Sequence, residues 1–212
     1  MPVEKPADHP RFPDPKIGVL LLNLGTPDGT DYWPMRRYLS EFLSDPRVIE
    51  TSPLIWQPIL QGIVLSTRPQ KSGANYSRIW DKAENDSPLR VITRRQAEKL
   101  QARLGDSVIV DFGMRYGNPS TGSRLKALQQ AGCRKILLAP LYPQYSATTT
   151  ATANDQLFRA LMKIRRAPAV AVCLRYCSGR PRRPSPARAS AWRSSTPGSP
   201  ATRRCRARSW RR

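Results

Sequence analysis

The chain has 212 residues, which is enough for one good-sized domain or for one domain with a long appendage. Its formal net charge is +21, but twelve arginines and no acidic residue fall within residues 173–212, so residues 1–172 carry only +9. The basic excess therefore does not mark the body of the chain as a nucleic-acid-binding domain. The longest apolar stretches, residues 17–22 and 54–65, are shorter than the roughly 20 apolar residues of a membrane-spanning helix.

The first elements in chain order are a disordered start, a strand and a helix. Residues 1–15 are rich in proline and charge, unlike a signal peptide, and we expect them to be disordered. Residues 16–24 (KIGVLLLNL) form a continuous apolar run, which is typical of a strand buried on both faces of a parallel sheet. Asp31 is a candidate N-cap for a helix over residues 32–43, and the Asp-Pro pair at 45–46 would end it.

Residues 54–65 carry apolar side chains at helical spacing, namely Ile55, Trp56, Ile59, Leu60 and Ile63. Such a stripe usually belongs to the core, and an exposed apolar lip is the less common alternative. A polar connector is expected to begin at Arg68-Pro69 and to lead towards Tyr76 and Trp80.

A second long helix is expected over residues 88–104, with Ser87 as its N-cap, Pro88 in its first turn and Gly105 after its end. Its inward face is expected to consist of Leu89, Ile92, Leu100 and Leu104.

The remaining elements alternate between strand and helix. Short apolar runs predict strands over residues 107–112 and 136–139, and a further one over 167–172. Ser120 or Thr121 is the candidate N-cap of the helix between the first two of these strands. A helix with Leu157, Leu161 and Ile164 on one face follows the loop 142–146. This alternation predicts an α/β domain with a doubly wound parallel sheet over residues 16–172.

In such a sheet the loops that leave the strands share the carboxyl edge, where ligands bind. Those loops would bring residues 23–27, Arg115-Tyr116 and residues 142–146 together. A flat, apolar ligand with carboxylate arms would suit aromatic rings beside an arginine and helix N-termini. Taken singly, however, each arginine is more often a solvated surface charge, and each tyrosine is more often half-buried packing.

Several common sites are not supported by the sequence. It contains no phosphate-binding G-x-x-x-x-G-K-[ST] loop, no G-x-G-x-x-G after the first strand, no G-x-S-x-G and no cysteine/histidine cluster with metal-ligand spacing. His9 is the only histidine, and it is more readily explained as a solvated terminal residue than as a ligand. Cys133 is the only cysteine of residues 1–172, which fits a reducing, cytoplasmic location.

Four segments closely resemble ferrochelatases of the proteobacterial type. They are LLNLGTPD (21–28), RRYLSEFLSDPRVIE (36–50), FGMRYGNPS (112–120) and LAPLYPQYSATTTAT (138–152). The resemblance covers about residues 16–170. It implies one of two similar Rossmann-like domains that face each other across a cleft, and the insertion of ferrous iron into a porphyrin during heme biosynthesis. The porphyrin and Fe²⁺ are then substrates, and no cofactor is implied.

The resemblance also implies porphyrin-binding positions in this chain. They are Leu24, Arg68, Tyr76, Ser87, Arg115, Tyr116 and Tyr142. Residues 54–65 would then be the apolar lip of the porphyrin cleft, which reverses the preference for core there.

The sequence departs from the family pattern in its last part. The histidine and glutamate that serve ferrochelatases as catalytic groups lie in the second domain, and neither has a counterpart in this chain. We therefore assign no catalytic and no metal-binding residue, and we expect the 212-residue chain to be inactive in iron insertion. Residues 173–212 are made largely of Arg, Pro, Ser and Ala without apolar periodicity, and we expect them to form a disordered tail.

Three interpretations of the tail compete. It could bind nucleic acid, serve as a plain linker, or result from out-of-frame translation of GC-rich DNA, and its composition favours the last. No specific nucleic acid is expected as a partner. Peripheral association with a membrane, the oligomeric state and the choice between protoporphyrin and coproporphyrin stay open.

Overall fold

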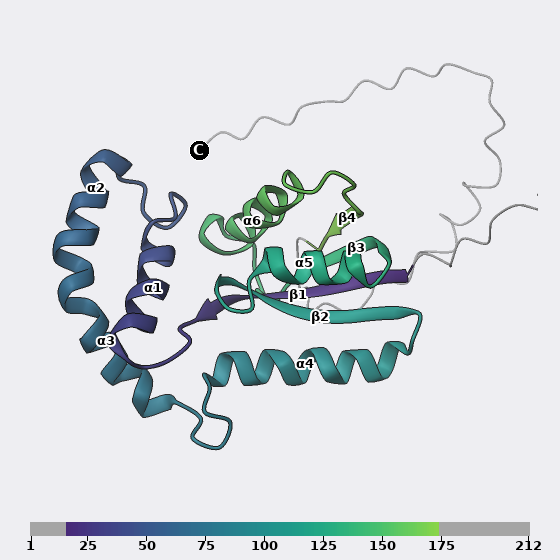
Figure 1. The fold of residues 1–212 in the computed structure, drawn as a ribbon, viewed down its shortest axis with the longest axis horizontal. Coiled ribbons are helices and arrows are strands. Elements are labelled where there is room, and N and C mark those ends of the chain that lie inside the picture. Colours follow the sequence, from purple (N-terminus) through teal and green to yellow (C-terminus); the bar gives the residue numbers. More distant parts are fainter. Residues whose placement is uncertain (1–15, 174–212) are drawn as a thin grey trace, which may run out of the picture. The chain divides into compact units, whose positions relative to one another are not determined.

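The computed structural model describes residues 16–173, so the predictions for residues 1–15 and for the tail beyond Cys173 lie outside the described part. Four parallel strands form one sheet in the order β2-β1-β3-β4 (Figure 1). Their bounds are Lys16–Thr26 for β1, Val108–Gly117 for β2, Cys133–Pro140 for β3 and Ala169–Val172 for β4. The predicted parallel α/β sheet is confirmed.

Eight helical segments accompany the sheet in the described residues. The α-helices are α1 (Tyr32–Leu43), α2 (Pro53–Ile59), α3 (Leu65–Ile79), α4 (Pro88–Leu104), α5 (Thr121–Gln130) and α6 (Thr152–Leu161). Two π-helical turns precede α3 and α6, η1 (Leu60–Val64) and η2 (Ala147–Ala151). The bounds of α1 and α4 agree with the prediction, and Ser120 caps α5 by accepting a hydrogen bond from the Ser123 N–H at 3.3 Å.

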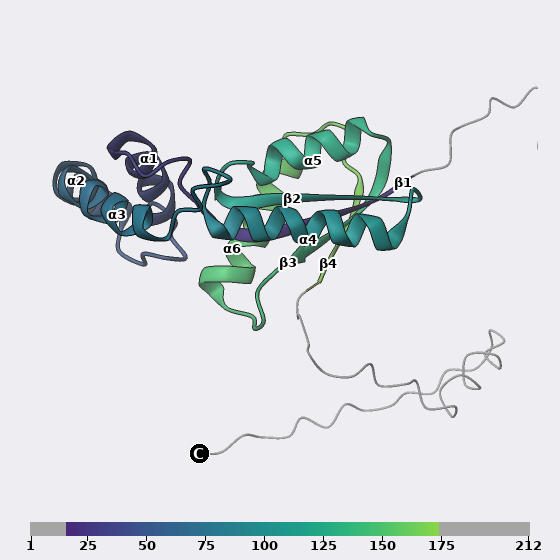
Figure 2. The same ribbon diagram turned by 90° about the horizontal axis from the view of Figure 1, so that it is seen from below.

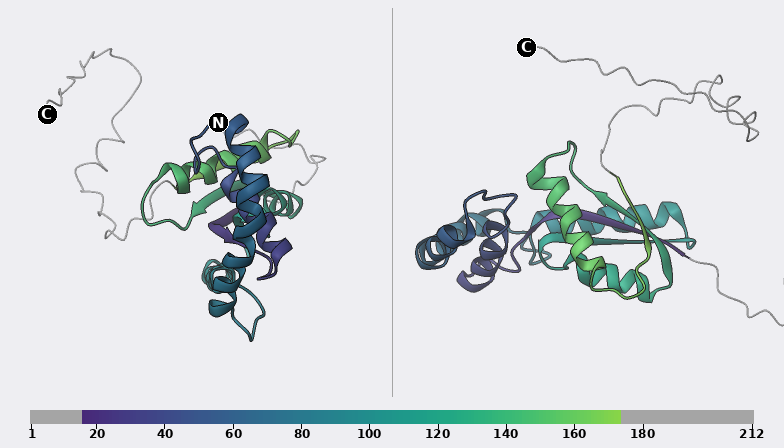
Figure 3. Two further views of the ribbon diagram at one scale, coloured as in Figure 1. Left: turned by 90° about the vertical axis from the view of Figure 1, so that its left-hand side faces the viewer. Right: turned by 90° about the horizontal axis from the view of Figure 1, so that it is seen from above.

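Helices cover both faces of the sheet, because α4 lies on one face and α5 and α6 lie on the other (Figures 2 and 3). Alternate residues of β1 point to the two faces of the sheet, as the pleat of a strand requires. Leu20 and Leu22 pack with residues of α5 and α6, whereas Val19 and Leu21 pack with Ala97 of α4. The central strand is therefore buried on both faces, as its continuous apolar run predicts.

A third apolar cluster joins α1 and the η1–α3 segment to the end of β2. It consists of Met35, Tyr38, Leu39, Leu43, Leu60, Leu65 and Tyr116. Figure 3 shows α2 and α3 as one nearly continuous rod, so the predicted polar connector at Arg68-Pro69 is wrong. Pro69 lies inside α3, and the carbonyl of Leu65, which Pro69 cannot satisfy, accepts a hydrogen bond from the Tyr32 hydroxyl at 2.9 Å.

The apolar stripe at residues 54–65 divides between core and surface. Leu60 is fully buried, and the Trp56 Nε1–H donates to the Leu43 carbonyl at 2.8 Å. By contrast, Leu54 is 88% exposed and Ile63 is 65% exposed. Leu54 and Ile63 are thus exposed, as residues of a lip would be, and the assignment of the whole stripe to the core is wrong.

Two further details of the prediction are wrong. In α4 the buried residues are Val91, Thr93 and Ala97, whereas Ile92 and Leu104 are exposed. Leu100 is half-buried and packs against the cluster that contains Ala97, so this part of the expected inward face is confirmed. In addition, β2 continues to Gly117, so Arg115 and Tyr116 belong to a strand and not to an exit loop. Within residues 16–173, no helix has the length and apolar character to cross a bilayer.

Candidate functional site

The carboxyl ends of β1 and β2 meet closely because of one glycine. Gly25 pairs with Tyr116 across the two strands and has a φ of +115°, in the region that favours glycine. A Cβ atom at this position would lie only 1.9 Å from the Tyr116 carbonyl oxygen. Leu24, the preceding residue, is half-buried and packs against the cluster that contains Tyr116. The strand ends thus hold Leu24 and Tyr116 side by side.

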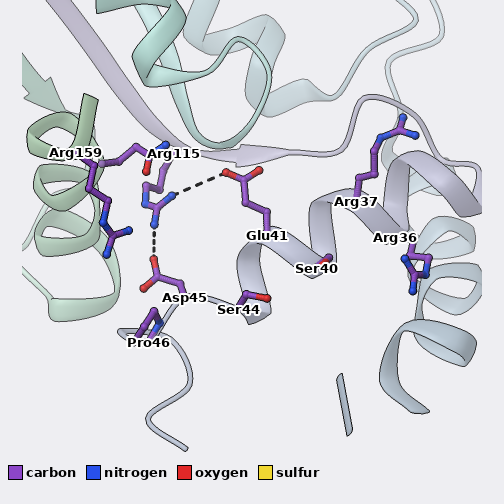
Figure 4. A pocket seen from close by; sticks show the side chains of 10 residues that line it. Arg36, Arg37, Ser40, Glu41, Ser44, Asp45, Pro46, Arg115 and Arg159 are labelled. Carbon is purple, nitrogen blue, oxygen red and sulfur yellow. Dashed lines mark hydrogen bonds and ion pairs between the residues drawn. The ribbon is translucent and has the colours of Figure 1, made fainter. Parts of the chain in front are cut away.

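A buried polar network lies at the same end of the sheet, around the carboxylate of Asp45. Its Oδ2 accepts hydrogen bonds from Arg115 Nη2 at 2.5 Å, from the Tyr116 hydroxyl at 2.7 Å, and from the Thr152 hydroxyl. Arg115 Nε donates to Thr152 Oγ1 at 2.7 Å. All four side chains are at least 95% buried, and Figure 4 shows Arg115 and Asp45 directed at each other.

The ionisation states in this network follow from its contacts. Burial alone would raise the pKa of Asp45, but hydrogen bonds from Thr152, the Arg47 N–H and Tyr116, with the charge of Arg115, lower it below its usual value. Burial raises the pKa of Tyr116 to about 12. At neutral pH the network therefore combines an ionised carboxylate, a charged guanidinium and a neutral phenol.

A hollow of about 490 Å³ adjoins this network on its open side. Arg115 forms part of its wall, together with Glu41 of α1 and Arg159 of α6 (Figure 4). Glu41 Oε2 accepts from the Gly117 N–H at 2.9 Å, and Glu41 Oε1 lies 4.0 Å from Arg115 Nη1. The Nε and Nη2 atoms of Arg115 thus lie inside the network, and its Nη1 atom lies near the hollow.

Tyrosines surround the network on its apolar side. The ring of Tyr76 stands edge-on to that of Tyr38, with centroids 6.4 Å apart, and both belong to or pack on the cluster around Tyr116. Tyr142 follows β3 and is half-buried, and burial together with the nearby Tyr116 raises its pKa. The Tyr142 hydroxyl is enclosed and has no hydrogen-bond partner among residues 16–173. These side chains offer aromatic faces and phenol hydroxyl groups.

The structure brings together five of the seven sequence-predicted site residues, namely Leu24, Tyr76, Arg115, Tyr116 and Tyr142. The other two lie apart from the network. Arg68 is exposed on α3 and lines a separate hollow of about 570 Å³ with Ile63 and Lys71. Ser87 is buried at the start of α4, where its N–H donates to Asp86 Oδ1 at 2.7 Å. Whether any of the seven contacts a porphyrin stays a prediction.

Sequence reasoning missed Asp45 and Thr152. The sequence marked Asp45 only as part of a helix stop, and Thr152 only as the end of a threonine-rich segment. One signal was present: Arg115 directly continues an apolar run that forms a strand, and a buried arginine requires an anionic partner. Among residues 16–173 no three His, Cys, Asp or Glu side chains are grouped so that they could hold a metal ion.

Comparison with known proteins gives a consistent result. The family model described as Ferrochelatase matches residues 16–180. The ferrochelatase of Mesorhizobium japonicum is 66% identical over 171 residues, which cover 80% of this chain and 48% of that protein. The ferrochelatase of Agrobacterium fabrum is 62% identical over 167 residues, which cover 78% and 48%, respectively. That of Gluconobacter oxydans is 66% identical over 159 residues, which cover 74% and 46%. The chain spans about half the length of the curated relatives it matches.

Proposed function

Because the chain belongs to the ferrochelatase family, we propose that residues 16–173 bind a porphyrin for the insertion of ferrous iron in heme biosynthesis. The observation that carries this proposal is the convergence of Leu24, Tyr76 and Tyr142 beside the Arg115 network at one end of the sheet. A porphyrin is a flat apolar ring with carboxylate arms. Apolar and aromatic side chains suit its faces, and an arginine suits an anionic group.

Metal insertion requires a group that accepts protons as well as residues that bind the porphyrin. When Fe²⁺ enters a porphyrin, two pyrrole N–H bonds break and two protons leave, so a group that accepts protons near neutral pH is needed. Residues 16–173 contain no histidine. Tyr116 has a pKa of about 12, and the pKa of Tyr142 is also raised, so both phenols stay protonated and cannot serve as that base. The proposed role of the described residues is therefore to hold and orient the porphyrin.

The exposed apolar residues of α2 and η1 fit the same role. Leu54, Ile55 and Ile63 project apolar surface, and Ile63 lines the hollow next to Arg68. We place these residues at an apolar lip of the porphyrin cleft. A contiguous patch of exposed apolar side chains usually marks a surface that receives a ligand, a partner or a membrane.

Titration of the 212-residue chain with protoporphyrin IX tests the binding proposal. We expect a saturable Soret shift with quenching of tryptophan fluorescence. The substitution Tyr142→Ala should weaken binding about tenfold, because it removes a half-buried ring from the site. Leu104→Ala is the control, since Leu104 is 41% exposed at the last residue of α4 and outside the ligand-binding loops, and it should change affinity less than about twofold. A signal that does not saturate, or equal losses in both variants, would refute the proposal.

The same chain should not insert iron by itself. Anaerobic incubation with Fe²⁺ and protoporphyrin IX should give metalloporphyrin no faster than the uncatalysed reaction, measured from the visible spectrum. Turnover above that background would show that the 212 residues contain a competent base after all.

A further inference from the structure

Several contacts hold the guanidinium of Arg115 in addition to its ion pair with Asp45. Its Nη2 donates to Asp45 Oδ2 at 2.5 Å, and its Nε donates to Thr152 Oγ1 at 2.7 Å. Its Cζ lies 4.2 Å from the centroid of the Tyr116 ring, so the guanidinium is also stacked. Two edges and one face of the planar group are therefore occupied, which leaves little rotational freedom.

The carboxylate that receives Arg115 is itself fixed on both oxygens. Asp45 Oδ1 accepts from the Arg47 N–H at 2.8 Å, and Oδ2 accepts from Arg115, Tyr116 and Thr152. The same short loop is tied to α6, because Arg47 Nε lies 2.5 Å from Asp155 Oδ2. Thr152 is the first residue of α6, so one helix positions both Thr152 and the loop that carries Asp45.

The remaining edge of Arg115 is available to a ligand. Nη1 makes no hydrogen bond within the described part of the chain, and Glu41 Oε1 lies 4.0 Å from it. Arg115 also lines the hollow between α1 and α6. A donor whose other atoms are fixed in advance loses little entropy when it binds a ligand group.

We propose that Asp45 and Thr152 are positioning residues that hold the guanidinium of Arg115 with Nη1 directed into the hollow between α1 and α6, where it would receive a carboxylate arm of the bound porphyrin. This inference rests on the proposed function of the domain. It assigns to Asp45 and Thr152 an effect on porphyrin binding that passes through Arg115. Thr152 relays the orientation, because its hydroxyl donates to Asp45 while its oxygen accepts from Arg115 Nε.

A double-mutant cycle tests this relay with the 212-residue chain and protoporphyrin IX. Thr152→Val keeps the side-chain shape but removes the hydroxyl, and it should weaken porphyrin binding about tenfold. In the background of Arg115→Gln the same substitution should change affinity less than about twofold, because its target is absent. Thr152→Ser, which keeps the hydroxyl, should restore affinity to within about threefold of the unsubstituted chain.

Thr121→Val is the matched control for the loss of a buried hydroxyl. Thr121 is also fully buried at the first residue of a helix, but its hydroxyl donates to the Met114 carbonyl at 3.0 Å and not to the network. It should leave porphyrin affinity within about twofold. Equal losses from Thr152→Val with and without Arg115, or an equal loss from Thr121→Val, would overturn the inference in favour of a purely structural role.

A second measurement tests the positioning without any ligand. The Arg115 Nε–H should give a protected ¹⁵N–¹H resonance, identified by its disappearance in Arg115→Gln, and Thr152→Val should accelerate its exchange with solvent at least tenfold. An unchanged resonance would refute the positioning. If the resonance responds but the unsubstituted chain binds no porphyrin, the proposed function fails and the ligand part of the inference fails with it, while the hold on Arg115 stands.

Discussion

Asp45 illustrates how a single side chain couples the stability of this domain to pH. Its carboxylate is 95% buried and has its pKa lowered by the hydrogen bonds and the charge that surround it. In the unfolded chain an aspartate titrates at about 3.9. The folded state therefore binds the proton less readily than the unfolded state, so stabilisation from Asp45 is complete above about pH 4 and declines as the pH falls through the lower, folded value.

The variant Asp45→Asn tests this coupling. At pH 7 it should lower the free energy of unfolding by about 3–5 kcal/mol, because Arg115 is left as a buried charge without its anion. The difference between the two proteins should shrink as the pH falls below 4, where Asp45 also loses its charge. Denaturant unfolding at pH 7, 5, 4 and 3 measures both quantities.

Asp31→Asn provides the control for this pH series. Asp31 is exposed at the N-cap of α1, and its side chain makes no capping hydrogen bond, although its position suits one. Its substitution should change stability by less than about 0.5 kcal/mol at every pH. Curves for Asp45→Asn that run parallel to those of the unsubstituted chain from pH 7 to pH 3 would contradict the assignment of the pH effect to Asp45.

At the scale of one element, α3 shows how a helix tolerates an internal proline. Pro69 has no N–H, so the Leu65 carbonyl one turn earlier lacks its helical partner. The Tyr32 hydroxyl, from the first residue of α1, donates to that carbonyl at 2.9 Å. The defect in one helix is thus corrected by a side chain of another, and the two helices are joined where they pack.

Tyr32→Phe and Pro69→Ala together test this compensation. Tyr32→Phe alone should cost about 1–2 kcal/mol, because it leaves the Leu65 carbonyl without a partner. In the Pro69→Ala background the residue 69 N–H can satisfy that carbonyl, so the same substitution should cost less by about 1 kcal/mol. Thermal or denaturant unfolding of the four proteins gives the coupling, and strictly additive losses would refute it.

Helices α1, α3 and α4 show why the sequence predicts some elements and not others. Local signals suffice for α1 and α4, since apolar periodicity and the N-cap position, and for α4 also the terminal Gly105, lie within the element or next to it. The continuation of α3 through Pro69 depends on Tyr32, which is 33 residues before its partner Leu65. A proline in an isolated segment predicts a break, and only the packed neighbour makes the helix possible.

For the candidate site, too, the sequence predicts some residues and misses others. Leu24 lies near the end of β1 and Tyr142 follows β3, so both lie at the carboxyl edge of the sheet, where the rule for parallel sheets predicts ligand binding. Asp45 and Arg115 are 70 residues apart, and Thr152 follows Arg115 by 37 residues. No spacing rule connects such positions, because their proximity is a property of the folded sheet and its helices.

At the scale of the whole described domain, β1 is the centre on which the other elements depend. It pairs with β2 on one side and with β3 on the other, and Leu20 and Leu22 are fully buried. β4 differs, since within residues 16–173 it pairs only with β3, over four residues that are exposed or half-buried. The amide hydrogen bonds of β1 should therefore open only when the entire domain unfolds, whereas those of β4 can open locally.

Native-state hydrogen exchange tests this ranking. Protected amides in residues 19–22 should exchange with the free energy of global unfolding, and those in residues 169–172 should exchange at least about a hundredfold faster after correction for intrinsic rates. Low concentrations of denaturant should accelerate β1 steeply, because its opening exposes the whole core, and should hardly affect β4. If β4 instead matches β1 in rate and in denaturant dependence, the edge strand is part of one cooperative unit with the centre. The sheet would then owe its stability to the packing of its helices across all four strands, and not to the double pairing of β1.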